Sequence, residues 1–156
     1  MKAIQKTLLG LCLASTLLSV QAFASEFDQY LQEKKILNSD FQIIDENSLN
    51  ELLTVLSSED SKTLPLEIDN NTIIEQLNLS AHQTELKGLI ITPDFAQFET
   101  DLGNQKVEKI IRDNLLQNCA IFFEHQYQIK NPYQITLDLR SETKTYHMKI
   151  SQQDCQ

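Results

Sequence analysis

Two cysteines, Cys119 and Cys155, constrain the fold of this chain more than any other feature of its sequence. Between them, apolar and polar residues alternate over 133–139 and again over 145–150, which is the pattern of two half-buried strands. A short polar turn at 141–143 separates the two runs, so the segment predicts a β-hairpin. The residues before Cys119 have helical spacing. A bond between the two sulfur atoms would therefore tie the end of the hairpin to the end of a helix.

The start of the chain has the features of a secretory signal peptide. Lys2 and Lys6 form a short basic segment, residues 8–20 are mostly apolar, and residues 22–24 (Ala-Phe-Ala) suit a cleavage site. The apolar run is too short to span a bilayer, and no later segment would stop transfer. We therefore predict cleavage after Ala24, no stable membrane anchor after cleavage, and a periplasmic or secreted location.

Cys12 lies inside the predicted signal peptide and follows Leu11, whereas a lipid-attachment site needs a small residue there. We therefore do not predict a lipoprotein. The remaining cysteines form an even pair in an exported chain, which favours a structural disulfide between Cys119 and Cys155. A redox-active pair is the alternative. It is disfavoured because catalytic cysteines usually lie two residues apart at a helix start, and Cys119 is predicted at a helix end.

The chain is acidic, with a formal net charge of −9 at pH 7, and the predicted signal peptide carries lysines but no acids. Such a charge repels nucleic acid and anionic membrane surfaces. The three histidines, His82, His125 and His147, are far apart and lack metal-ligand spacing. Three glycines could hardly build a phosphate or dinucleotide loop, and no nucleophile elbow occurs. We predict no metal, no cofactor and no catalytic residue.

Residues 25–46 are predicted to form an N-terminal helix and a linker. Ser25 can cap a helix over 26–37, which either packs on its own domain or serves as a partner-docking arm. Residues 41–44 suit a short edge strand or a linker. A second helix over 49–58, capped by Asn47 or Ser48, begins the main domain, predicted over 47–156.

From residue 64 the apolar period changes to two, which predicts a half-buried strand over 64–68. Pro65 cannot donate to a sheet, so it belongs on an edge or at the strand start. Asp69 and Thr72 are predicted to satisfy backbone amides of the following turn, a structural role. Two further strands complete this region: residues 73–79 fit a helix or a strand, with the strand slightly favoured, and residues 86–92 fit a third strand.

The longest helical stretch begins at Pro93-Asp94 and ends near Cys119, with an interruption or kink at Gly103-Asn104. Residues 120–130 can add one more helical turn. Asn131-Pro132 stops the helix, because the residue before a proline is biased away from helical backbone angles.

Three motifs resemble a group of small exported proteins of Gram-negative bacteria that has no characterised activity. They are the strand opening Pro65-Leu-Glu-Ile-Asp69-Asn-Asn-Thr72, the mid-chain Cys119 and the closing Asp154-Cys155. The resemblance implies a β-β-helix-β-β core. The chain departs from that pattern at 86–92, which lacks aromatic residues, and at Asn131-Pro132, where a glycine-containing turn is usual. Together with the periodicities, this predicts an α+β fold: N-terminal helices, then a β-β(-β)-α-β-β antiparallel sheet packed on a helix, with one disulfide.

Three functions are compatible with these features. The leading hypothesis is a non-catalytic binding, adaptor or assembly protein of the periplasm, pilotin-like or chaperone-like, which binds another envelope protein through a strand edge such as residues 63–69. The second is a secreted effector or inhibitor that acts outside the cell. The third is a hydrolase with a non-standard site, which would require convergent acids in a deep cleft.

Overall fold

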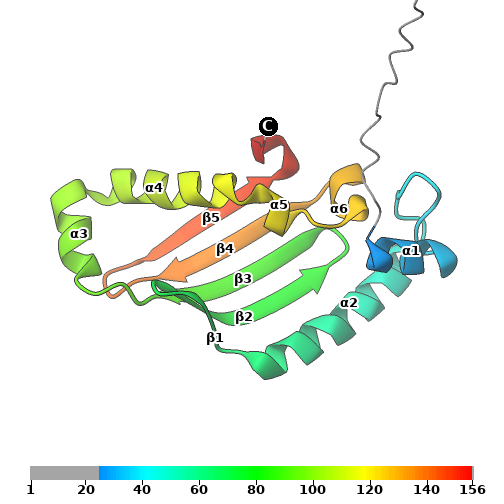
Figure 1. The fold of residues 1–156 in the computed structure, drawn as a ribbon, viewed down its shortest axis with the longest axis horizontal. Coiled ribbons are helices and arrows are strands. Elements are labelled where there is room, and N and C mark those ends of the chain that lie inside the picture. The colour runs from blue at the N-terminus through cyan, green and yellow to red at the C-terminus, as the bar shows by residue number, and fades with distance from the viewer. Residues whose placement is uncertain (1–24, 156) are drawn as a thin grey trace, which may run out of the picture.

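The computed structural model describes residues 25–155, so the predicted signal peptide and its cleavage site lie outside the described residues. Figure 1 shows a sheet flanked by helices. The helices are α1 Glu26–Glu33, α2 Glu46–Asp60, α3 Phe95–Leu102, α4 Asn104–Gln117, α5 Cys119–Phe122 and α6 Gln126–Lys130, with two short 3-10 turns, η1 Ser61–Thr63 and η2 Gln152–Cys155.

The sheet has five strands in the order β1-β2-β3-β4-β5, and the predicted α+β fold is confirmed. Its strands are β1 Leu66–Asp69, β2 Thr72–Ser80, β3 Gln83–Ile90, β4 Gln134–Arg140 and β5 Thr145–Ser151. The sheet is mixed, not antiparallel throughout as predicted. β3 and β4 pair in parallel, because the chain between them crosses back through α3 to α6, whereas the other neighbours are joined by tight turns and are antiparallel.

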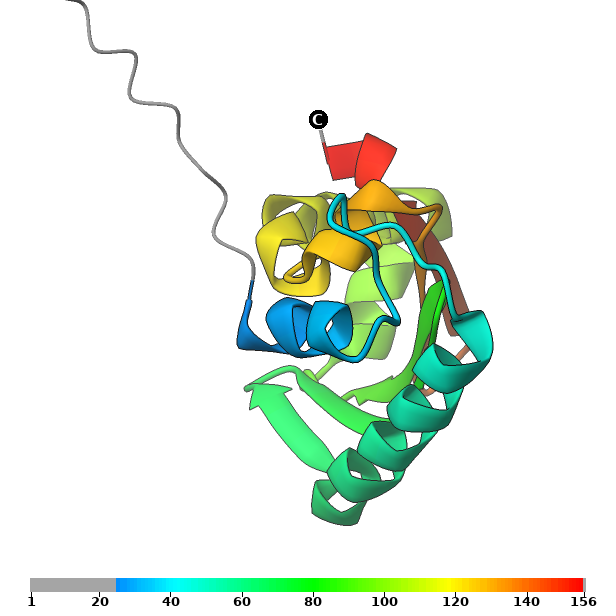
Figure 2. The ribbon, with the colours of Figure 1, turned by 90° about the vertical axis from the view of Figure 1, so that its right-hand side faces the viewer.

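The helices pack on one face of the sheet. Alternate residues of β4 and β5 point to that face, among them Leu137, Ile150 and Tyr146, and all three are buried. They form two clusters, one with Leu53 of α2 and one with Val107 of α4. In Figures 1 and 2, α4 runs over the β4–β5 side and α2 runs beside β2. The intervening residues of the strands are polar and form the outer face of the sheet.

The N-terminal helix is part of the domain, since Leu31 is fully buried in the same cluster as Leu53. Ser25 caps α1, as predicted. The helix ends earlier than predicted because Lys35 adopts a left-handed conformation, with φ 59°. Residues 41–44 form no strand beyond a single bridge between Leu37 and Ile43.

The predicted caps of the second helix are wrong. Asp45 is the N-cap of α2, and its Oδ1 accepts a hydrogen bond of 3.1 Å from the Ser48 backbone N–H. The Ser48 hydroxyl in turn donates to Asp45 Oδ2 at 2.7 Å. These two hydrogen bonds from Ser48 are the main reason why the pKa of Asp45 is lowered. Asp45, Ser48 and Asn47 all have capping chemistry, so only the path of the preceding linker selects among them.

The prediction that the first strand is half-buried is also wrong, because all four residues of β1 are exposed. Pro65 precedes the strand, as predicted. β3 begins at Gln83, three residues before the predicted start at Leu86. On β3, Gly88 leaves room for the backbone of β2: a Cβ atom there would lie 2.4 Å from the Ile73 carbonyl oxygen.

The crossover helices follow the sequence closely. Gly103, with φ 80°, separates α3 from α4, as predicted from the Gly-Asn pair. α4 ends at Gln117, and α5 and α6 supply short additional turns before Asn131-Pro132.

Candidate functional site

The exposed strand β1 is the candidate site, and residues Leu66–Asp69 are called the β1 edge here. One side of β1 pairs with β2, and among residues 25–155 no strand pairs with its other side. The pairing contains a bulge between Glu67 and Asp69, which leaves Ile68 without an opposite residue in β2. The β1 edge therefore offers a short run of backbone groups and a protruding apolar side chain.

β2 extends beyond β1, and α2 covers this remaining part of its edge. The hydroxyl of Ser57 accepts a hydrogen bond of 2.7 Å from the Leu79 backbone N–H, and Asn50 Oδ1 accepts one of 2.9 Å from the Ala81 N–H. Side chains of a helix thus take the place of a neighbouring strand. Among residues 25–155, the β1 edge is thus the part of this side of the sheet that no other element covers.

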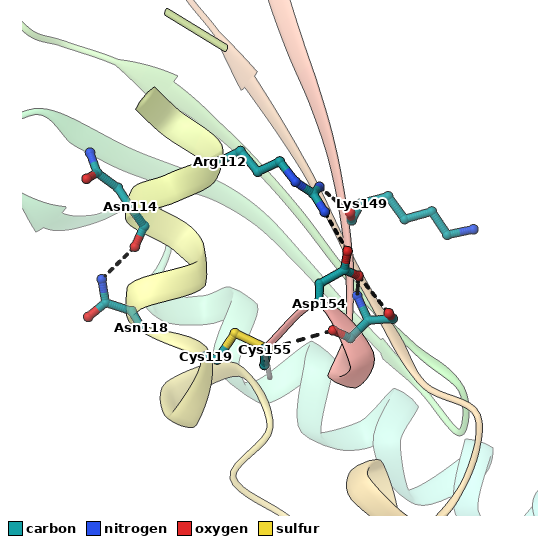
Figure 3. The surroundings of a disulfide bond; sticks show 8 residues. Arg112, Asn114, Asn118, Cys119, Lys149, Asp154 and Cys155 are labelled. Atoms are coloured by element: carbon teal, nitrogen blue, oxygen red, sulfur yellow. Dashed lines mark hydrogen bonds and ion pairs between the residues drawn. A yellow bond between two sulfur atoms is a disulfide. The ribbon is translucent and has the colours of Figure 1, made fainter. Parts of the chain in front are cut away.

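The opposite edge, β5, is partly closed by the C-terminal turn (Figure 3). Arg112 of α4 donates to the Lys149 carbonyl oxygen at 3.0 Å and to Asp154 Oδ1 at 2.6 Å. Asp154 Oδ2 accepts from the Ser151 hydroxyl and backbone N–H, and these bonds, followed by the charge of Arg112, lower the pKa of Asp154. The β5 edge is therefore a less open docking surface than the β1 edge.

The predicted disulfide fastens this turn. Cys119 Sγ and Cys155 Sγ are 2.02 Å apart and join the start of α5 to the end of η2. Figure 3 shows the bond beside the ion pair between Arg112 and Asp154. One covalent and one ionic contact thus hold the end of the chain against the crossover helices.

The β1 edge exposes apolar side chains in an acidic setting. Leu66 is 50% exposed and Ile68 is 56% exposed. Glu67 and Asp69, between and beyond them, are exposed and form no ion pair within the described chain. The surface combines apolar contact area with unneutralised negative charge.

Asp69 and Thr72, the turn residues singled out in the sequence, lie at the end of this edge. Asp69 Oδ1 accepts a hydrogen bond of 2.7 Å from the Asn71 backbone N–H. Thr72 begins β2 opposite Ile90, and the hydroxyl that bonds to Asn71 Oδ1, at 3.2 Å, belongs to Thr92. Asp69 therefore lies at the end of the candidate site, whereas Thr72 pairs with the neighbouring strands of the sheet.

The three histidines lie apart and each has a local partner. His82 Nδ1 lies 3.1 Å from the Pro132 carbonyl oxygen, and His147 Nδ1 lies 2.8 Å from Asp138 Oδ1 on the outer face of the sheet. His125 precedes α6 and contacts Ser25. Among residues 25–155 no group of three His, Cys, Asp or Glu side chains could hold a metal ion.

A hollow of about 800 Å³ lies where the end of α6 meets the chain before β3 and the η2 turn. Its lining includes His82, Lys130 and Gln152 but no aspartate or glutamate. The convergent acids that a paired-carboxylate hydrolase needs therefore do not line this hollow. None of the helices in the described part of the chain is long and apolar enough to cross a membrane.

Two acidic residues that the sequence analysis did not identify as buried, Glu99 and Asp28, lie in the interior of the described chain. Glu99 of α3 accepts hydrogen bonds from the hydroxyls of Ser141, Thr143 and Tyr146, and so holds the β4–β5 turn against α3. Asp28 of α1 accepts from the backbone of α6. Nothing in the sequence marks Glu99, whereas the Ser-x-x-Asp spacing of 25–28 is a capping signal that indicates a special role for Asp28.

No family model matches this chain, and a search of curated proteins gave no significant match. Among solved structures, the chain is similar to a Pseudomonas aeruginosa protein provisionally described as secreted, with a TM-score of 0.47 and 11% identity over 72% of this chain and 97% of the other. It is similar to the type II secretion system pilotin AspS of Vibrio cholerae, with a TM-score of 0.47 and 18% identity over 70% of this chain and 94% of the other. For the pilotin EpsS of Vibrio vulnificus the TM-score is 0.39 and the identity 14%, over 71% and 94%.

Proposed function

We propose that this protein is an exported, non-catalytic binding protein of the cell envelope that holds an extended segment of another envelope protein at the β1 edge. The observation that carries the proposal is a pair of half-exposed apolar side chains, Leu66 and Ile68, on a strand whose outer side pairs with no other strand of the described chain. A pilotin-like or assembly-chaperone role is the concrete form of this function.

The side chains of the β1 edge indicate which kind of polypeptide segment would bind there. An added strand gains backbone hydrogen bonds from β1, and its side chains contact Leu66 and Ile68. Because β1 is short and bulged, apolar contact contributes more to binding than backbone pairing does. Glu67 and Asp69 form no ion pair with any of residues 25–155, so the segment that fits carries Lys or Arg between apolar residues. Binding should weaken as salt rises, since these charges are exposed.

Site-specific photo-crosslinking tests the proposal in the producing cells. A photoreactive residue at Ile68 should give one dominant adduct with an envelope protein, and the crosslinked segment should be apolar and basic. Ile121 on α5 is 73% exposed, and α5 lies across the sheet from β1 (Figure 1), so the same substitution there is the matched control. No adduct at Ile68, or the same adducts at both positions, would argue against the proposal.

Leu66→Asp should reduce the yield of that adduct at least tenfold, because it removes apolar contact and adds a third negative charge to the β1 edge. The side chain is half-exposed, so the free energy of unfolding should change by only about 0.5 kcal/mol. Mass spectrometry of the adduct measures the loss of binding, and thermal unfolding of the purified variant measures the change in stability. Ile121→Asp should leave the yield unchanged.

Cell fractionation separates this function from that of a secreted effector or inhibitor. An envelope protein should be recovered with the periplasm, together with the adduct. Recovery of most of the protein from the culture medium would favour the secreted alternative.

A further inference from the structure

The carboxylate of Asp28, in α1, is fully buried and accepts hydrogen bonds from the start of α6 and from Ser25. Its side chain has 0% exposure. Oδ2 accepts from the Gln126 backbone N–H at 2.9 Å, and Oδ1 accepts from the Tyr127 N–H at 3.2 Å. Asp28 therefore caps α6 from α1, which lies beside it in Figures 1 and 2.

The remaining donors to this carboxylate come from Ser25. The Ser25 hydroxyl donates to Asp28 Oδ2 at 2.7 Å, and the Ser25 backbone nitrogen lies 3.3 Å from the same oxygen. The Ser25 hydroxyl also accepts from the Asp28 backbone N–H and contacts His125 Nδ1 at 2.9 Å. Ser25 is thus fixed by its side chain with its backbone nitrogen directed at a buried acid.

Within residues 25–155 no lysine or arginine pairs with Asp28, and the side chain that could bring a positive charge to it is His125, whose Nδ1 lies 3.9 Å from Oδ2. A buried carboxylate is costly unless a positive charge or several donors compensate it. Four donors already point at it, and a full positive charge at one of them would complete the site.

The sequence predicts where that charge comes from. Cleavage after Ala24 would make Ser25 the first residue of the exported chain, and its nitrogen would become an α-ammonium group instead of a peptide N–H. We propose that processing at Ala24–Ser25 creates an ion pair between the new α-ammonium of Ser25 and the buried carboxylate of Asp28, which strengthens the contact between α1 and α6 in the correctly processed protein.

One effect opposes this pair. A cation at the N-terminus of α1 is disfavoured by the helix dipole. That interaction is weak and decays within the first turn, whereas the ammonium lies at hydrogen-bond distance from a carboxylate that water does not reach. The pair therefore stabilises the processed chain overall. Any residue left in front of Ser25 would replace the ammonium by a neutral amide.

Three versions of the processed protein test the inference: the chain that begins with a free Ser25 amine, the same chain with one extra alanine in front, and the same chain acetylated on Ser25. The free-amine chain should melt about 5 °C above the other two. The intact mass of the protein recovered from the periplasm should correspond to a start at Ser25. Equal melting temperatures, or a start at another residue, would overturn the proposal.

The variant Asp28→Asn provides a second test, because it keeps the size of the side chain and removes the charge. In this background the three versions should melt within about 1 °C of one another. A second readout covers the case in which that variant does not fold. The Ser25 amine of the otherwise unaltered protein should react with an acylating reagent at least tenfold more slowly than the same amine in a short peptide. An equal rate would show that the ammonium is not paired, and the idea would fail.

Discussion

Replacing Cys119 and Cys155 together by serine should lower the free energy of unfolding by about 4 kcal/mol, the largest loss we expect from any change to this chain. The disulfide closes a loop of 36 residues that contains α5, α6 and the β4–β5 hairpin. Without the bond, the unfolded chain regains the freedom of that loop, and the chain-entropy relation gives about 4 kcal/mol for such a length. This is a large share of the roughly 5–15 kcal/mol that stabilises a typical domain. Urea unfolding of the oxidised protein and of the double variant measures the difference.

The matched control keeps the disulfide and removes the ionic contact beside it. Arg112→Ala breaks the ion pair with Asp154 and the bond to the Lys149 carbonyl oxygen. Both charged side chains are about one-third exposed, at 37% and 32%, so solvent screens the pair and the loss should stay near 1 kcal/mol. If the double serine variant lost no more than Arg112→Ala does, the disulfide would not be the main anchor of the terminal turn.

Glu99→Ala should destabilise the protein by about 3 kcal/mol, because it removes the one acceptor shared by three hydroxyl groups. Tyr146 is almost fully buried, and its hydroxyl donates to Glu99 Oε1 at 2.5 Å. With the carboxylate gone, that hydroxyl would be left unpaired in the core. Glu99→Gln keeps an acceptor oxygen and should cost about half as much. Thermal and urea unfolding of both variants check the order.

Glu99 also predicts how stability depends on pH. Burial alone would raise the pKa of Glu99, but the hydrogen bonds from Thr143, Tyr146 and Ser141, with the charge of Lys144, outweigh it, so the pKa is lowered from its usual 4.5. Burial and the bond to Glu99 raise the pKa of Tyr146, which keeps its proton as a donor. A carboxyl whose pKa is lowered by folding contributes stability that is present above the unfolded pKa and is lost as pH falls through the folded value.

The stability advantage of the wild-type protein over Glu99→Gln should therefore be full near pH 6 and should shrink as the pH falls below about 4.5. Unfolding midpoints of both proteins between pH 6 and pH 3 give this difference directly. An advantage that grew on acidification would mean that the carboxylate is not the favoured form in the folded protein.

Local patterns predicted most of the secondary structure. The alternation over 133–150 gave the β4–β5 hairpin, because a strand with one buried face must alternate. The left-handed Gly103 divided the crossover helix as expected, since glycine adopts positive φ at little cost. The even cysteine pair identified the disulfide.

Features that depend on distant neighbours could not be predicted in this way. Alternation shows which residues share a face but not which strands are adjacent, so the parallel pairing of β3 and β4 was missed. The run from Leu64 to Ile68 has the period of a half-buried strand. In the folded chain both faces of β1 are exposed. In the sequence Glu99 looks like a surface acid, and it is buried because the turn at Ser141 packs against it. The exposure that makes the β1 edge a candidate site is therefore a property of the tertiary structure.

The parallel contact between β3 and β4 has a consequence for the folding rate. The β1-β2-β3 meander and the β4–β5 hairpin each pair residues that are close in sequence, whereas Gln83 meets Gln134 only after the whole crossover is in place. Contacts between such distant positions carry the highest entropic cost and slow a chain's search for its native state. Substitutions on the β3 side of this seam, such as Leu86→Ala opposite Leu137, should therefore slow refolding more than equally destabilising substitutions within the hairpin, such as Met148→Ala, and stopped-flow refolding would show the difference.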